Sequence, residues 1–151
     1  MFGFGRKKEE KLELLKKENI RLDCPAVEKD EAIRAVGKLL VDSGYVDESY
    51  IDAMLKRELS FPTNIGNGIA LPHGVEEAKK DIRHSGIAVM VYPDGVNWGS
   101  EAVKLVIGIA GVGEDHLEIL SIIAEKMAEP DAVERVVASD RDTIYKVFTE
   151  K

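Results

Sequence analysis

The chain has 151 residues, of which 44% are hydrophobic and 32% are charged, and its formal net charge is −7. This size and composition indicate one soluble globular domain with an adequate core. The negative charge argues against a general nucleic-acid partner, no apolar run is long enough to cross a bilayer, and the N-terminus lacks the apolar core of a signal peptide. We therefore expect a cytoplasmic protein that does not insert directly into the membrane.

The N-terminal part is predicted to be a lead-in to the folded domain. Residues 6–18 are rich in Lys, Glu and Leu, which is typical of a short surface helix or a mobile segment. We therefore divide the chain into an N-terminal lead-in or helical extension over residues 1–18 and a single domain over residues 19–151. Residues 19–22 are predicted to form a short edge strand.

Two amphipathic helices are predicted to follow. Residues 30–42 and residues 48–59 both repeat apolar side chains at helical spacing. Asp47 is the predicted N-cap of the second helix, and Pro62 closes the segment after it. Arg57 lies near the C-terminal end of this second helix, at the edge of its apolar stripe.

The middle of the chain alternates turns with apolar strands. Residues 63–68 form a dense turn pattern that leads into a strand over residues 69–71. Residues 86–92 are nearly all apolar, which is typical of an interior strand, and a turn is predicted at residues 93–95. A third apolar strand is predicted over residues 103–110.

Three helices are predicted in the C-terminal part. The first begins at Glu114 or Asp115, the second has Pro130 in its first turn, and the last follows a capping box formed by Ser139 and Asp142. Helices that alternate with apolar strands predict an α/β fold. We expect a three-layer sandwich, in which helices flank both faces of one mixed β-sheet.

The sequence Gly68-Ile-Ala-Leu-Pro-His-Gly74 is the most informative stretch for function. Pro72 ends the short apolar strand because proline cannot donate to a sheet ladder, and Gly74 permits backbone angles that other residues avoid. This pattern predicts that His73 lies at a strand tip on a stiff turn, open to a partner. Histidine is the side chain most easily poised between a neutral nucleophile and a cation near neutral pH.

A second candidate, His116, follows Asp115 at the start of a predicted helix. With Asp115 as the N-cap, His116 is the first helical residue, where free N–H groups and the helix dipole favour a phosphoryl anion. Both His73 and His116 lie where an apolar strand ends or just beyond it, and sites in open α/β sheets gather at strand ends. Spacing alone does not require the two to meet. The third histidine, His84, is interpreted as an ordinary surface or strand-entry residue.

Five segments carry a resemblance to a known family: Ala53-Met-Leu-Lys-Arg-Glu58, Gly66-Asn-Gly-Ile-Ala-Leu-Pro-His-Gly74, Tyr92-Pro-Asp-Gly-Val96, Leu105-Val-Ile-Gly-Ile-Ala110 and Glu114-Asp-His-Leu117. With these segments in family order through most of residues 19–150, the chain resembles enzyme IIA of the bacterial sugar phosphotransferase system, in its mannitol–fructose class. The Tyr-Pro-Asp-Gly-Val segment is most similar to the mannitol branch. Val75 departs from that branch, whose members often carry threonine there.

The resemblance implies that His73 accepts a phosphoryl group from the phosphohistidine of the small carrier protein HPr. His73 then passes the group to a cysteine of a IIB domain, which belongs to a separate membrane permease. The resemblance also implies that His116 is an active-site neighbour, that Arg57 is the cation near the phosphoryl group, and that no metal or other cofactor takes part. Cys24, the only cysteine, does not lie in a IIB-like setting and is interpreted as a half-buried structural thiol.

Two other functions remain open. One is a regulatory module that binds partners according to its phosphorylation state, as in the nitrogen branch of the family, although the Tyr92–Val96 segment argues against it. The other is a metal-dependent hydrolase that uses His73, His116 and an acidic residue, although no His-x-x-x-His pair supports it. The sequence also leaves open the sugar, the reacting imidazole nitrogen and the oligomeric state.

Overall fold

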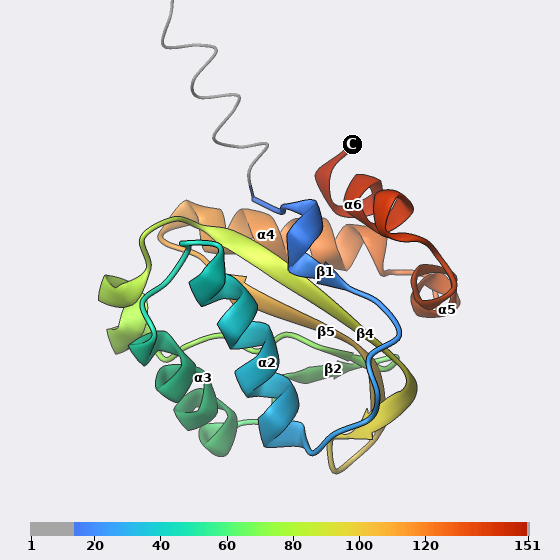
Figure 1. Cartoon of the computed structure of the whole chain (residues 1–151), viewed down its shortest axis with the longest axis horizontal. Helices are drawn as coiled ribbons and strands as arrows, with labels where there is room; N and C mark the ends of the chain where they lie inside the picture. Colours follow the sequence, from blue (N-terminus) through green and yellow to red (C-terminus); the bar gives the residue numbers. More distant parts are fainter. Residues whose placement is uncertain (1–13, 151) are drawn as a thin grey trace, which may run out of the picture.

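The computed structural model describes residues 14–150, which form a β-sheet between two layers of helices (Figure 1). Within this range, no helix combines the length and the apolar character needed to cross a bilayer. The strands are β1 (Ile20–Arg21), β2 (Asn64–Gly66), β3 (Ile69–Ala70), β4 (Gly86–Asn97) and β5 (Ala102–Ala110). The helices are the 3₁₀-helices η1 (Lys17–Asn19) and η2 (Glu76–Asp81), and the α-helices α2 (Lys29–Asp42), α3 (Ser49–Ser60), α4 (Glu114–Lys126), α5 (Ala132–Val137) and α6 (Arg141–Thr149).

The sheet combines parallel and antiparallel neighbours, as predicted. Its strand order is β1-β4-β5-β3-β2. The pairs β4–β5 and β2–β3 are antiparallel, whereas β1–β4 and β3–β5 are parallel. Because β3 and β5 run in the same direction, both end at the same edge of the sheet. The segments that contain His73 and His116 follow these two strands, so the topology brings them to one place.

Alternate residues of β4 and β5 enter opposite cores. Ala88, Met90 and Val106 pack in the cluster that includes the buried faces of α2 and α3. Val89 and Leu105 pack in the cluster formed with α4, α5 and α6. Burial of both faces explains why β4 begins as a continuous apolar run. The predicted three-layer sandwich is confirmed (Figure 1).

The start of the described chain packs against the sheet instead of forming an α-helix. Residues 1–13 of the expected lead-in lie outside the described residues. The Leu14 carbonyl accepts a hydrogen bond from the Ile87 amide at 2.8 Å, and Leu15 is only 1% exposed. η1 then leads into β1, which is an edge strand as predicted.

Residues 93–95 do not form the predicted turn. β4 continues through them to Asn97, and its pairing with β5 shifts register in this stretch. Gly95 has a φ of 83°. The turn-forming residues therefore produce an irregularity inside a long strand, as in a β-bulge. Cross-strand pairing with β5 keeps residues 93–95 in the strand. The local sequence pattern contains no information about this pairing, so it predicted a turn.

The predicted α-helices are confirmed, but the details of how several of them begin differ from the predictions. The carboxylate of Asp47 does not cap α3 and instead pairs with Arg83 at 2.9 Å. α6 is capped by Asp140, which accepts a hydrogen bond from a backbone amide of the first turn, and not by Ser139. Pro130 precedes α5 instead of lying in its first turn. Short polar side chains offer several alternative caps within one loop, so spacing alone did not select among them.

Candidate functional site

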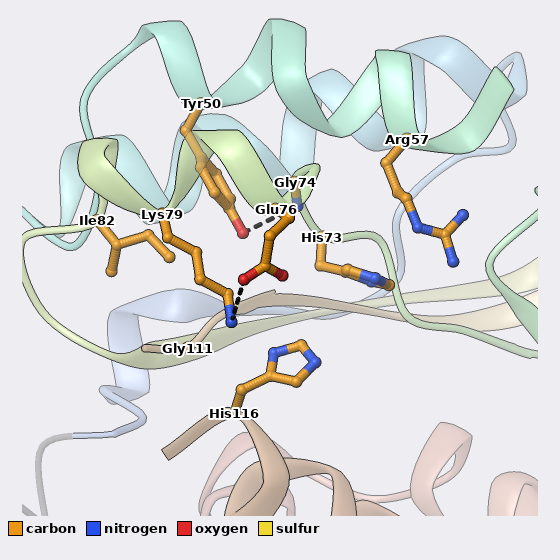
Figure 2. A pocket seen from close by; sticks show the side chains of 9 residues that line it. All are labelled: Tyr50, Arg57, His73, Gly74, Glu76, Lys79, Ile82, Gly111 and His116. Atoms are coloured by element: carbon orange, nitrogen blue, oxygen red, sulfur yellow. Dashed lines mark hydrogen bonds and ion pairs between the residues drawn. The ribbon is translucent and has the colours of Figure 1, made fainter. Parts of the chain in front are cut away.

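One pocket contains the three residues that the sequence analysis singled out. His73, His116 and Arg57 all line it, and they come from the segment after β3, from α4 and from α3 (Figure 2). The pocket has a volume of about 240 Å³. The other residues that line it are Tyr50, Gly74, Glu76, Lys79, Ile82 and Gly111.

His73 is half-buried, and hydrogen bonds to the backbone hold it in place. The Ile109 amide donates to the Pro72 carbonyl at 2.9 Å, and His73 forms a parallel bridge with Ile109. The Nδ1 atom of His73 lies 2.8 Å from the carbonyl oxygen of Leu71. A carbonyl oxygen can only accept, so we assign the ring proton to Nδ1. The neutral ring then keeps its lone pair on Nε2, which is the nitrogen free to react.

Tyr50 holds the turn that follows His73. Its hydroxyl donates to the Ile109 carbonyl at 2.9 Å and accepts from the Gly74 amide at 2.9 Å. A Cβ atom on Gly74 would lie 2.6 Å from the Tyr50 ring, so a larger residue would displace that ring. Unusual backbone angles were the predicted reason for glycine at position 74, and this prediction is wrong. Its φ lies outside the left-handed region, and what this position requires is close approach to an aromatic ring.

His116 meets His73 edge to face. The two ring centroids are 5.6 Å apart and the ring planes are inclined by 62°. α4 begins after Gly113, so Asp115 is inside the helix and is not its N-cap, and His116 is not the first helical residue. A Cβ atom on Gly111 would lie 2.6 Å from the Cα atom of His116. The missing side chain of Gly111 thus lets the first turn of α4 approach the end of β5, which brings His116 to the pocket.

The pocket favours the neutral form of both imidazoles. Burial is the largest cause of the lowered pKa of His73, and the positive charges of Arg57 and Lys79 lower this pKa further. The hydrogen bond with the Leu71 carbonyl acts in the opposite direction and raises it. Burial also lowers the pKa of His116 most, followed by the positive charge that His73 carries when it is protonated and by the charge of Lys79. Both rings are therefore uncharged at neutral pH, and His73 can act as a nucleophile.

Arg57 enters the pocket from the last turn of α3. Its Nη1 atom donates to the Phe61 carbonyl at 2.9 Å. The centre of its guanidinium group lies 5.7 Å from the centroid of the Phe61 ring. These contacts orient the guanidinium group and leave part of its fork of N–H donors available for an anion.

Glu58, beside Arg57, ties the end of α3 to neighbouring elements. It is only 5% exposed. Its Oε2 atom accepts hydrogen bonds from Trp98 Nε1 at 2.8 Å and from the Thr63 amide at 2.9 Å, and Lys29 Nζ lies 3.2 Å away. Burial raises the pKa of Glu58, but the bonds from Thr63, Trp98 and Lys29 together lower it more, so the pKa is below its ordinary value. This anchored carboxylate steadies the helix turn that carries Arg57.

Glu58→Gln should lower the free energy of unfolding at pH 7 by about 1–3 kcal/mol, because it removes a buried charge that is hydrogen-bonded and paired with Lys29. Glu134→Gln is the matched control. It breaks an exposed pair with Lys104 and should lower the free energy of unfolding by less than about 1 kcal/mol.

The stabilisation by Glu58 should also depend on pH. The pKa of Glu58 in the folded protein is below its value in the unfolded chain. The carboxylate therefore stabilises the fold fully above the unfolded pKa, and this stabilisation is lost as the pH falls through the folded pKa. Urea unfolding of both variants at neutral and acid pH measures these effects, and equal losses at pH 7 would contradict the anchoring role.

Three polar side chains of the pocket escaped the sequence analysis, those of Tyr50, Glu76 and Lys79. Tyr50 is one aromatic position on an amphipathic helix, and nothing in that pattern indicates that its hydroxyl reaches the turn at Gly74. Glu76 and Lys79 belong to a charged stretch, which is typical of a solvated surface. Their closeness to His73 in the sequence was the one clue that could have drawn attention to them.

The other candidates lie outside the pocket. The His84 ring stacks on Tyr45 with centroids 5.3 Å apart, and its Nδ1 atom lies 2.7 Å from the Ser85 carbonyl oxygen. Cys24 is half-buried against the core beneath α2, and burial raises the pKa of its thiol. Among residues 14–150, no three His, Cys, Asp or Glu side chains gather in a way that could hold a metal ion.

Comparison with known proteins places this chain in a family. The model of the "Phosphoenolpyruvate-dependent sugar phosphotransferase system, EIIA 2" family matches residues 13–151. The mannitol-specific phosphotransferase enzyme IIA component of Geobacillus stearothermophilus is 48% identical over 139 residues, which cover 91% of this chain and 96% of that protein. The crystal structure of the mannitol IIA protein of Escherichia coli has a TM-score of 0.82 at 37% identity and covers 89% of this chain and 98% of its own. The same bacterium's enzyme IIA of mannitol, solved in complex with phosphorylated enzyme IIB, has a TM-score of 0.84 at 35% identity, over 91% of this chain and 98% of that one.

Proposed function

This chain belongs to the EIIA 2 family of the phosphoenolpyruvate-dependent sugar phosphotransferase system, and on that premise we propose that it carries a phosphoryl group between two proteins on His73. As an enzyme IIA component, the chain is a phosphotransferase. The proposed donor is phospho-HPr, and the proposed acceptor is the cysteine of a IIB domain on a separate membrane permease, reached from the cytoplasm. The observation that carries this proposal is a neutral His73 ring with its Nε2 lone pair free, in a pocket with cationic side chains.

The proposed reaction consists of two in-line displacements at phosphorus. In the first, the Nε2 lone pair of His73 forms an N–P bond while the N–P bond of the donor breaks, and that electron pair stays on the donor nitrogen. In the second, the IIB thiolate forms an S–P bond while the N–P bond of His73 breaks, which returns the lone pair to Nε2. The Nδ1 proton stays on the ring throughout, where the Leu71 carbonyl accepts its hydrogen bond. Neither displacement requires a metal ion or other cofactor.

Positive groups and N–H donors near Nε2 support both displacements, because negative charge spreads over the equatorial phosphoryl oxygens. Arg57 offers a permanently charged fork to these oxygens. His116 is the second donor, since its ring lies against His73 and forms no hydrogen bond within residues 14–150. In this proposal His73 reacts, while Arg57 and His116 stabilise the group that is transferred.

The surroundings of the pocket suit protein partners. The segments that build the pocket also carry large apolar side chains whose exposed fractions range from 44% to 88%. Both partners must reach the same nitrogen of His73 in turn, so brief contacts over a small shared surface are expected. The apolar side chains proposed for this surface are Leu59, Phe61, Val112 and Leu117.

We also propose that the transported compound is mannitol or a related sugar or polyol. Similarity to a mannitol-specific relative at 48% identity supports this choice, as does the Tyr92–Val96 segment. Val75 leaves the position after Gly74 without a hydroxyl group, so no contact to the phosphoryl group is proposed from it. The alternative is a nitrogen-type regulator, which holds its phosphoryl group and changes its affinity for a partner.

A relay assay tests the proposed function. The chain is incubated with phospho-HPr that carries ³²P, and a mannitol-type IIB domain is then added. We expect acid-labile label on the chain, followed by its rapid loss to the IIB domain. A chain that accepts no label would contradict the phosphocarrier role, and a chain that keeps its label when the IIB domain is added would contradict the transport role in favour of the regulator.

A further inference from the structure

We propose that Lys79 is a second phosphoryl-binding cation of this site, and that Glu76 holds its ammonium group while the site is unloaded; this inference rests on the phosphocarrier function proposed above. Lys79 lines the pocket together with both histidines. Its Nζ atom lies 3.5 Å from the Oε2 atom of Glu76. In Figure 2, Lys79 and Arg57 reach the pocket from opposite sides of His73.

The backbone that carries Lys79 is held at both ends and in the middle. η2 follows Gly74, whose amide is hydrogen-bonded to the tyrosine hydroxyl described above. After η2, Ile82 forms an antiparallel bridge with Val46. Within η2, Ala78 is 5% exposed and packs in the core beneath α2 and α3. These contacts hold the Cα atom of Lys79, so its ammonium group can move only as far as its aliphatic stem allows.

The pair between Glu76 and Lys79 is weak enough to be exchanged. The side chain of Glu76 is 82% exposed and that of Lys79 is 34% exposed, and an ion pair in such a setting contributes little. A phosphoryl group on Nε2 of His73 carries about two negative charges on its terminal oxygens. It is therefore the stronger partner for the ammonium group. When the phosphoryl group arrives, the ammonium group moves from the carboxylate to a phosphoryl oxygen, and this move transfers no proton and changes no covalent bond.

The charge of Lys79 already acts on both imidazoles. After burial, which is the largest cause for each ring, this charge contributes to the lowered pKa of His73 and of His116. Lys79 thus adds to the effect of burial that keeps the empty site in the neutral, nucleophilic form, and it stabilises the loaded site. We therefore expect it to shift the equilibrium of phosphoryl transfer from HPr toward this chain.

The decisive measurement is the partition of phosphoryl groups between HPr and the chain at equilibrium. Lys79→Met should lower the ratio of phosphorylated chain to phosphorylated HPr by about five- to tenfold, and Lys79→Arg should restore much of it. Lys80→Met is the matched control, because Lys80 lies on the same 3₁₀-helix but is exposed and outside the pocket; it should leave the ratio unchanged. Glu76→Gln, which releases the ammonium group, should raise the ratio.

NMR titration of the unphosphorylated protein adds a readout that does not depend on transfer. Lys79→Met should raise the pKa of both His73 and His116, and Lys80→Met should change neither. A wild-type ratio with wild-type pKa values in Lys79→Met would overturn this inference and leave the phosphocarrier function standing. If Lys79→Met does not fold, Glu76→Gln provides the test. An unchanged ratio of phosphorylated chain to phosphorylated HPr in Glu76→Gln would overturn the proposed move of the Lys79 ammonium group from Glu76 to the phosphoryl group. Absence of label on the wild-type chain would overturn the proposed function, and this inference with it.

Discussion

Replacing His73 with glutamine should abolish phosphoryl uptake while the chain stays folded. Glutamine is polar and of similar reach, but its amide nitrogen has no lone pair that can attack phosphorus. The half-buried position of His73 and the backbone bridge to Ile109 do not depend on the imidazole. After incubation with labelled phospho-HPr, we expect no acid-labile label on the His73→Gln variant.

His84→Gln is the matched control for this result. It is the same substitution at a histidine whose ring stacks on Tyr45, outside the pocket. Circular dichroism verifies the fold of both variants, and the control should take up label as the wild type does. Acid-labile label on His73→Gln, or a folded His84→Gln that takes up none, would show that the acceptor has been assigned to the wrong histidine.

Arg57→Met should slow transfer from phospho-HPr by about 10²- to 10³-fold, which is the cost of losing one preorganised group that stabilises developing charge. Methionine keeps an apolar stem that can pack against Phe61 but removes the guanidinium fork. Arg57→Lys should recover only part of the rate, because a point charge cannot bind two oxygens as the fork does. Rapid-quench measurement of label on the chain gives these rates.

The control for Arg57 is Arg34→Met, which removes an exposed arginine of α2 that does not line the pocket. It should transfer at the wild-type rate, which separates the effect of position from a change of one unit in net charge. A wild-type rate for Arg57→Met would mean that Arg57 does not face the phosphoryl group. The Phe61 contacts would then be the main role of the guanidinium group.

The predicted elements agree with the structure wherever a long apolar pattern was available. α2 and α3 lie within one or two residues of their predicted bounds, because the buried stripe of a helix is repeated along neighbouring residues. The continuous apolar run of β4 correctly indicated an interior strand. The prediction failed at residues 93–95, where pairing with β5 converts turn-forming residues into part of a strand, and at helix starts, where several polar side chains compete for one cap.

The candidate site was predicted in part. The Pro-His-Gly pattern pointed to His73, whereas the roles of Arg57 and His116 came from the family resemblance and not from spacing. The structure brings all three into one pocket. The contributions of Tyr50 and Lys79 were missed, because each appears in the sequence as an ordinary position of an amphipathic or charged segment.

The sequence by itself determined that this is an acidic α/β chain with a histidine just beyond a short apolar strand, because composition and periodicity are properties of residues close together in the chain. Only the tertiary structure decided why position 74 must be glycine and which charged and polar side chains face the His73 ring. These features depend on the parallel pairing of β3 with β5 and on the packing of α3, η2 and α4 around their ends. Such contacts join segments far apart in the sequence, so local sequence patterns do not predict them.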